Sequence, residues 1–97
     1  KKALERANLS INDIDIVEIN EAFASQSIAC LKDLGIDQKK ANLDGGALAL
    51  GHPLGATGAR ITGKAADLLR RENKKYALST QCIGLGMGIA TVIESVN

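Results

Sequence analysis

A cluster of β-branched residues near the N-terminus narrows the possible folds of this chain more than any other part of its sequence. The cluster consists of Ile14, Ile16, Val17 and Ile19. It predicts a mostly buried strand over residues 15–20, because β-branched side chains pack well on a pleated surface. A helical pattern follows at once from about Glu21 to Leu34, and Gly35 is a typical residue to end it. A buried strand that leads directly into a helix predicts an α/β crossover.

The rest of the chain continues in this way. A second long helical pattern has a small or apolar face made of Gly58, Ile61, Ala65, Leu68 and Leu69. Shorter elements are also expected: a helix end over residues 1–8, a helical turn opened by a Ser10–Asp13 capping box, and a short strand over residues 42–44. Residues 76–81 and 89–96 predict two strands joined by a glycine-rich turn over residues 82–87. We therefore expect an α/β fold, a three-layer βαβα unit that ends in an antiparallel hairpin.

Composition and charge exclude several classes of protein. The 97 residues suffice for one small domain, and twelve basic against eleven acidic residues leave a net charge of +1. Phe23 and Tyr76 are the only aromatic residues, so neither a basic nucleic-acid footprint nor a base-stacking platform is expected. The mean hydropathy of +0.02 argues against a membrane span. One histidine and two separated cysteines lack the spacing of a metal site, so we expect no metal.

Cysteine usage bears on the cellular compartment. Two cysteines in a chain of this length do not form a disulfide framework, which favours a reducing, cytoplasmic location. The chain begins at Lys1 without an initiator methionine, so an upstream targeting peptide is compatible with the sequence.

The first candidate functional position is the junction between the predicted strand and helix. Here the sequence reads Asn20-Glu21-Ala22-Phe23. Asn20 can cap the helix N-terminus, and Glu21 in the first turn would interact favourably with the helix dipole. In the alternative interpretation, the Asn20 amide projects into a cleft, where it holds a water molecule or an oxyanion. Both interpretations fit the local pattern, and capping accounts for both residues.

The second candidate position is a run of glycines and small residues from Gly45 to Gly58. It contains the only histidine and the only proline of the chain, His52 and Pro53. Pro53 favours an extended conformation at His52, so the imidazole is expected to be presented from a bend. The flanking glycines allow close approach of a ligand to the backbone. The alternative is a turn histidine between two helices.

The third candidate position follows the strand predicted over residues 76–81. Cys82 is followed there by alternate glycines, Gly84, Gly86 and Gly88. A thiol can attack or move protons, and backbone N–H groups freed of side chains can bind an oxyanion. The alternative is a buried, apolar cysteine beside a glycine hairpin.

Taken together, these three blocks resemble the C-terminal signature blocks of the thiolase family, in the family's order. The blocks are Asn20-Glu21-Ala22-Phe23, the run Gly45–Arg60 around Gly51-His52-Pro53, and Cys82-Ile83-Gly84-x-Gly86-Met87-Gly88. The resemblance runs from about Ser10 to the C-terminus. It implies the C-terminal catalytic segment of an acyltransferase that makes or cleaves 3-ketoacyl-CoA thioesters. It also implies a coenzyme A thioester as substrate and no bound cofactor.

The resemblance implies a role for each matched residue. His52 would take the proton of the family's nucleophilic cysteine and help to bind a thioester oxygen. Asn20 would hold the catalytic water that completes this oxyanion hole. Cys82 would move the α-proton of acetyl-CoA, and the N–H of Gly84 would contribute to a second oxyanion hole. Other residues of the same blocks are expected to contact the substrate: Phe23, Gly51 and Gly86.

Two departures from the family pattern bear on activity. Leu85 stands where the family usually has glycine, so either this position adopts an ordinary backbone conformation or the second oxyanion hole is distorted. The family's nucleophilic cysteine lies in an N-terminal half, and neither Cys30 nor Cys82 matches its block. We therefore expect the isolated chain to lack turnover and to require the missing N-terminal half as a partner. The resemblance also implies a homo-oligomer. The alternative is a non-catalytic, truncated thiolase-like module that binds an acyl-CoA or a partner subunit.

Overall fold

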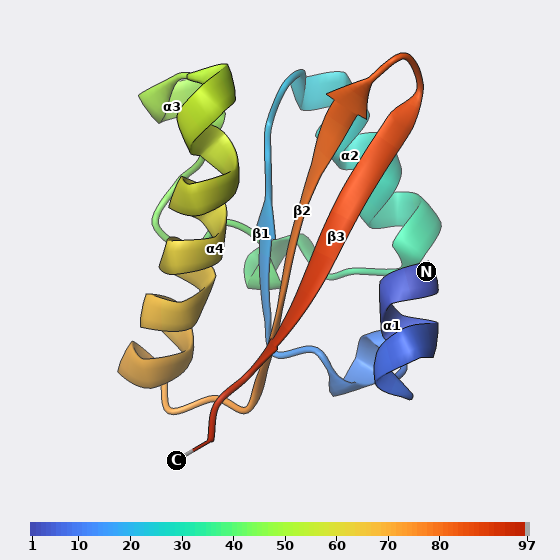
Figure 1. Cartoon of the computed structure of the whole chain (residues 1–97), viewed down its shortest axis with the longest axis vertical. Helices are drawn as coiled ribbons and strands as arrows, with labels where there is room; N and C mark the ends of the chain where they lie inside the picture. The colour runs from blue at the N-terminus through green and yellow to red at the C-terminus, as the bar shows by residue number, and fades with distance from the viewer. Residues whose placement is uncertain (97) are drawn as a thin grey trace.

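A mixed sheet of three strands runs through the middle of the structure, a computed structural model that describes residues 1–96 (Figure 1). The strands are β1 (Ile16–Ile19), β2 (Tyr76–Gly84) and β3 (Met87–Glu94), in the order β1-β2-β3. β1 and β2 are parallel, whereas β2 and β3 form an antiparallel hairpin. The expected α/β class and the terminal hairpin are confirmed.

Helices cover both faces of this sheet (Figure 1). They are α1 (Lys2–Ala7), α2 (Ala24–Leu34), α3 (Ala47–Leu50) and α4 (Leu54–Arg71), with 3₁₀ turns η1 (Ile11–Asp13) and η2 (Gln38–Lys40). α4 packs on one face and α1 and α2 on the other, which confirms the three layers. The Asp13 carboxylate accepts hydrogen bonds from the backbone N–H and the hydroxyl of Ser10, both at 2.7 Å, so the predicted capping box opens η1. None of the helices in residues 1–96 has the length and apolar character needed to span a bilayer.

Strand β1 is buried on both faces because its side chains alternate between two apolar clusters. One cluster lies on the side of α1 and α2 and consists of Leu4, Ile14, Val17, Ile19, Leu31 and Leu78. The other lies on the side of α4 and consists of Ile16, Ala65, Leu68, Leu69 and Ala77. By the same alternation, Glu18 and Asn20 share the face of Ile16 and point toward α4.

The start of α2 differs from the prediction. The helix begins at Ala24, not at Glu21. The backbone N–H of Asn20 still donates to the carbonyl of Thr80, at 2.9 Å. The pairing with β2 therefore holds the chain extended through Asn20, and the helix can begin only after the following residues have changed its direction.

The short strand predicted over residues 42–44 is not formed. Asn42 has a φ of 50°, outside the range of a strand, and only Ala41 pairs with Val17, in an isolated bridge. The Asn42 side chain takes the place of a strand neighbour. Its amide donates to the carbonyl of Ile19 and its oxygen accepts from the N–H of Ile19, both at 2.9 Å. One side chain thus satisfies two polar groups on the outer edge of β1.

The hairpin turn is shorter than predicted. β2 continues to Gly84 and β3 begins at Met87, so the turn contains only Leu85 and Gly86. Their φ angles are 53° and 74°, both positive, as in the type I′ turns whose twist matches that of the flanking strands. An ordinary backbone conformation at Leu85, one of the two expected alternatives, is therefore excluded.

Leu85→Gly is expected to raise the free energy of unfolding by about 1 kcal/mol, because a left-handed conformation is sterically unfavourable for a residue with a Cβ atom and carries no steric penalty for glycine. The Leu85 side chain is 98% exposed, so its removal loses no packing. Urea denaturation of the chain measures the change. Leu85→Ala is the matched control, since alanine keeps the Cβ atom, and it should change the stability by less than about 0.5 kcal/mol. An equal gain in both variants would show that this turn is not strained.

Candidate active site

The three sequence blocks meet at the end of the sheet where β1 and β2 both finish and α4 begins (Figure 1). The carboxyl ends of parallel strands lie side by side, and α/β folds gather their chemistry at this edge. Asn20 pairs with Thr80, two residues before Cys82. Gly58 of α4 lies against Gln81, because a Cβ atom at Gly58 would be 3.0 Å from the Gln81 Nε2. The fold therefore brings together the ends of β1 and β2 and the first turns of α4.

The side chain of Asn20 does not cap a helix. The N-cap residue of α2 is Phe23, whose side chain makes no capping hydrogen bond. Asn20 is only 1% exposed, and within residues 1–96 neither its Oδ1 nor its Nδ2 has a hydrogen-bond partner. The capping interpretation is wrong because strand pairing keeps the chain extended through Asn20, so that α2 begins later and its N-cap position falls on Phe23. A buried amide that the protein leaves unpaired is available to bind a water molecule or a ligand.

Glu21 likewise does not interact with the N-terminus of α2 in the way that was predicted. Its Oε1 accepts a hydrogen bond from the backbone N–H of Leu48 in α3, at 3.2 Å. Gly46 lies directly against this carboxylate, and a Cβ atom there would overlap it and would lie 2.7 Å from the Asn42 Nδ2. Glycine is the residue that fits this approach. Glu21 therefore joins the end of β1 to the glycine-rich segment.

His52 lies in the bend between α3 and α4. Gly51 before it has a φ of 87°, and Pro53 after it is the N-cap residue of α4. The His52 side chain is half-buried, and its Nδ1 lies 2.7 Å from the hydroxyl of Thr57. The predicted presentation from a bend is confirmed, and this bend does connect two helices, as the alternative interpretation required. The contact with Thr57 holds the ring in one orientation.

Cys82 is a free and exposed cysteine, so the alternative of a buried apolar residue is wrong. It lies within β2, opposite Gly88 of β3, and not in a turn as predicted. The strand register shifts between Cys82 and Gly84, where Ile83 has no partner and Gly84 has a φ of 123°. Such bulges re-aim side chains and are common beside active sites. The irregularity presents the Cys82 thiol and the neighbouring backbone at the end of the sheet.

Three further residues were predicted to contact the substrate, and they come from three different segments at this end of the molecule (Figure 1). Phe23 precedes α2 and is 71% exposed. Gly51 precedes His52, and Gly86 is in the hairpin turn. All three residues are exposed.

Glu18 is a buried carboxyl group that the sequence analysis did not single out. It is 1% exposed, and within residues 1–96 its Oε1 has no hydrogen-bond partner. Burial raises the pKa of Glu18 to about 7, although the positive charges of Arg60 and Lys64 act in the opposite direction. The available signal was a charged residue inside a run of buried β-branched ones. Glu18 lies two residues before Asn20, on the same face of the chain.

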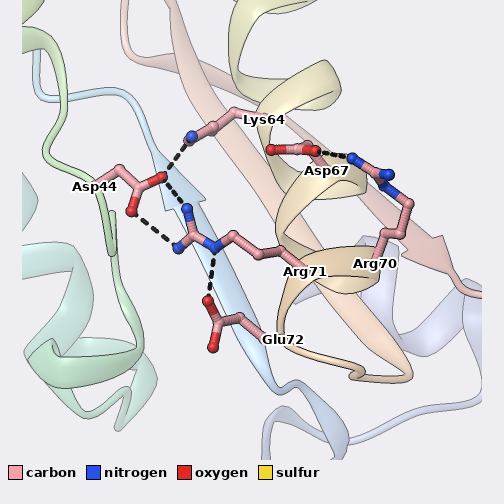
Figure 2. A network of polar contacts seen from close by, with 6 residues as sticks. All are labelled: Asp44, Lys64, Asp67, Arg70, Arg71 and Glu72. Carbon is pink, nitrogen blue, oxygen red and sulfur yellow. Dashed lines mark hydrogen bonds and ion pairs between the residues drawn. The ribbon is translucent and has the colours of Figure 1, made fainter.

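An exposed polar network anchors the loop that precedes the glycine-rich segment (Figure 2). Asp44 accepts two hydrogen bonds from the guanidinium of Arg71, at 2.6 and 2.9 Å, and also contacts the ammonium of Lys64. These cations hold the pKa of Asp44 well below its usual range. Arg71 pairs in addition with Glu72. The network fastens the start of the segment that carries His52 to the same helix that follows it.

The groups at this site suit acyl chemistry. They are an exposed thiol, an imidazole held through one ring nitrogen, a buried unpaired amide, and backbone N–H groups at a bulge. Thiols and imidazoles transfer protons, and amides and N–H groups stabilise oxyanions. In the part of the chain that the structure describes, no three His, Cys, Asp or Glu side chains lie together in a way that could hold a metal ion.

Known proteins share this sequence and this fold. Residues 1–95 match the family model of the thiolase C-terminal domain. The chain is 58% identical over 97 residues to the 3-ketoacyl-CoA thiolase of Vibrio vulnificus (strain YJ016), and 56% identical over 99 residues to that of Shewanella frigidimarina. These alignments cover 97% and 99% of this chain, but 25% and 26% of the relatives.

The structure also matches solved structures over nearly the whole chain. It matches the crystal structure of human mitochondrial 3-ketoacyl-CoA thiolase with a TM-score of 0.96 and 51% identity, over 99% of this chain and 24% of that one. The structure of the same human protein in complex with CoA matches equally well. This chain thus spans about a quarter of the length of the relatives that it matches. Because the domain model covers nearly all of its residues, the chain belongs to the thiolase family, as a C-terminal domain segment.

Proposed function

We propose that this chain supplies the C-terminal catalytic residues of a 3-ketoacyl-CoA thiolase, which carries out reversible Claisen condensation and thiolysis in fatty acid metabolism. The observation that carries the proposal is the meeting of Asn20, Cys82 and the start of α4 at one end of the sheet. The similarity to proteins named 3-ketoacyl-CoA thiolase over nearly the whole chain supports it. The two free cysteines support a reducing compartment such as the cytoplasm.

The proposed mechanism assigns one task to each group. His52 accepts the proton of a nucleophilic cysteine that belongs to an N-terminal half, and then donates to the thioester oxygen. The buried amide of Asn20 holds the water that completes this oxyanion hole. Cys82 removes the α-proton of acetyl-CoA in synthesis and returns a proton to the enolate in cleavage. The N–H of Gly84 polarises the acyl-enzyme carbonyl.

Exposed apolar side chains support a partner that covers this end of the molecule. They belong to the start of α2, the segment around α3, the start of α4 and the hairpin tip: Phe23, Leu48, Leu50, Leu54, Ile83, Leu85 and Met87. A cluster of large exposed apolar residues is typical of an interaction surface. We propose that the N-terminal half of a thiolase packs here and that the complete enzyme forms a homo-oligomer.

Reconstitution tests the proposed function. The chain alone is expected to show no thiolysis of acetoacetyl-CoA, since the nucleophile is absent. Mixing or co-expressing it with the remaining N-terminal three quarters of the Vibrio vulnificus relative should produce thiolysis, followed by the loss of acetoacetyl-CoA absorbance. The N-terminal part alone is the control and should be inactive. A soluble complex without any thiolysis would refute the proposal.

Leu85 is the one observation that favours a second candidate, a non-catalytic thiolase-like module that binds an acyl-CoA or a partner subunit. The residue occupies a glycine-like conformation directly after the Cys82 bulge. If this strain disturbs the second oxyanion hole, the reconstituted complex will bind CoA without turning over substrate. Recovery of turnover in Leu85→Gly would then identify the hole as the defect.

A further inference from the structure

Thr57 lies one turn into α4, and within residues 1–96 it makes the one hydrogen bond to the ring of His52. Its side chain is completely buried. The Thr57 Oγ1 lies 2.7 Å from the His52 Nδ1 and 3.1 Å from the backbone carbonyl oxygen of Pro53. That carbonyl also accepts the backbone N–H groups of Ala56 and Thr57. A single hydroxyl therefore stands between the imidazole and the first turn of the helix.

A count of hydrogen atoms favours one direction for these bonds. The hydroxyl has one hydrogen, and the Pro53 carbonyl can only accept. If the hydroxyl hydrogen pointed to the His52 Nδ1, two oxygen atoms would face each other at 3.1 Å with no hydrogen between them. If it points to the Pro53 carbonyl, both contacts contain a hydrogen, provided that Nδ1 carries one. The geometry therefore favours a hydrogen on Nδ1.

We propose that Thr57 is a positioning residue that holds His52 in the Nδ1–H tautomer. The neutral ring then has its lone pair on Nε2, on the side of the ring away from Thr57. A general base must present an unprotonated nitrogen to its proton donor. The proposed task of His52 is to accept the proton of a cysteine, so this catalytic meaning rests on the proposed function. The tautomer itself does not, because it follows from the contacts within this chain.

A purely structural role for Thr57 predicts something different. Threonine hydroxyls inside helices often donate to the carbonyl four residues earlier, and this bond satisfies the hydroxyl without any functional role. In that case the His52 tautomer would not depend on Thr57. Comparison of Thr57→Val, which keeps the branched shape but lacks the hydroxyl, with Thr57→Ser, which keeps the hydroxyl, separates the two roles.

Nitrogen-15 NMR of the imidazole gives a direct readout. His52 is the only histidine, so a chain labelled with ¹⁵N-histidine contributes one ring, alone or bound to an unlabelled N-terminal half. In spectra recorded at alkaline pH, the native chain and Thr57→Ser should show a protonated Nδ1 and an unprotonated Nε2. Thr57→Val should move toward the Nε2–H form that free histidine favours in water. An Nε2–H ring in the native chain would overturn the proposal, and so would an unchanged tautomer in a folded Thr57→Val.

Kinetics of the reconstituted enzyme complete the test. Thr57→Val should lower kcat on the order of 10²-fold, with little change in KM, and Thr57→Ser should restore most of the rate. A change in KM alone, with kcat unaltered, would contradict a role of Thr57 at His52. If the native complex is inactive, the proposed function fails while the NMR result still decides the tautomer. If Thr57→Val does not fold, the spectra of the native chain and Thr57→Ser remain decisive, since an Nε2–H ring in either overturns the proposal.

Discussion

Replacement of Cys82 by alanine is expected to lower the rate of thiolysis by the reconstituted enzyme by about 10²–10⁴-fold, the range observed when a positioned acid or base is lost. The thiol is exposed at the bulge near the end of β2, where it can reach a substrate bound against this edge of the sheet. Alanine removes the proton-carrying sulfur and leaves the strand intact. The rate is measured at saturating CoA, from the initial loss of acetoacetyl-CoA absorbance.

Cys30→Ala is the matched control for this experiment. Cys30 is the other free cysteine, half-buried on α2, where its sulfur accepts a hydrogen bond from Gln26 at 3.6 Å. Its removal should leave the rate unchanged. Full activity of Cys82→Ala would contradict the proposed role. Turnover by the isolated chain that disappears in Cys82→Ser would make Cys82 the nucleophile, and the assignment of roles would be wrong.

Replacement of Glu18 by glutamine is expected to raise the free energy of unfolding at alkaline pH by about 3 kcal/mol. The Glu18 carboxyl is buried, and its pKa in the folded chain is about 7 against an ordinary value of 4.5. Ionising it inside the protein is therefore unfavourable even though Arg60 and Lys64 attract the charge. Repulsion by Asp44 and Glu21 adds to the cost. Glutamine has nearly the same shape and never carries the charge.

The pH dependence of this effect has a definite sign. Below pH 4.5 the carboxyl is protonated in both states, so the native chain and Glu18→Gln should be equally stable. Between pH 4.5 and about 7 the unfolded chain releases the proton while the folded chain retains it, so the native chain loses stability as the pH rises. Above about pH 7 the full difference in stability between Glu18→Gln and the native chain persists. Urea denaturation of both proteins across this range measures it.

Glu5→Gln is the matched control for the Glu18 experiment. Glu5 is an exposed glutamate on α1, so its replacement should change the stability by less than about 0.5 kcal/mol. A Glu18→Gln variant that is less stable than the native chain at alkaline pH would show that Arg60 forms a net stabilising pair with Glu18. A difference that does not vary with pH would show that Glu18 is not buried as described.

Local patterns predicted the site only in part. His52 was predicted to lie in a bend because Pro53 restricts the residue before it, and that restriction acts between neighbours. For Asn20 the local pattern favoured a helix cap. Strand β2, some sixty residues later, pairs with its backbone and makes the cap impossible. Cys82 was placed in a turn for a similar reason, because its glycines look like a loop until β3 pairs with them.

The sequence by itself determined the class of fold, the family, and the identity of the candidate residues. Its β-branched cluster, its helical faces and its three motif blocks are features that neighbouring residues define. Tertiary structure alone decided which side chains are buried without a hydrogen-bond partner, which hydroxyl contacts the His52 imidazole, and how far the pKa of Glu18 is raised. The burial of Asn20 and Glu18 depends on segments remote in the sequence, because burial arises only when such segments pack together. The contact of Thr57 with His52 is local, but it depends on the bend that places the imidazole against the first turn of α4.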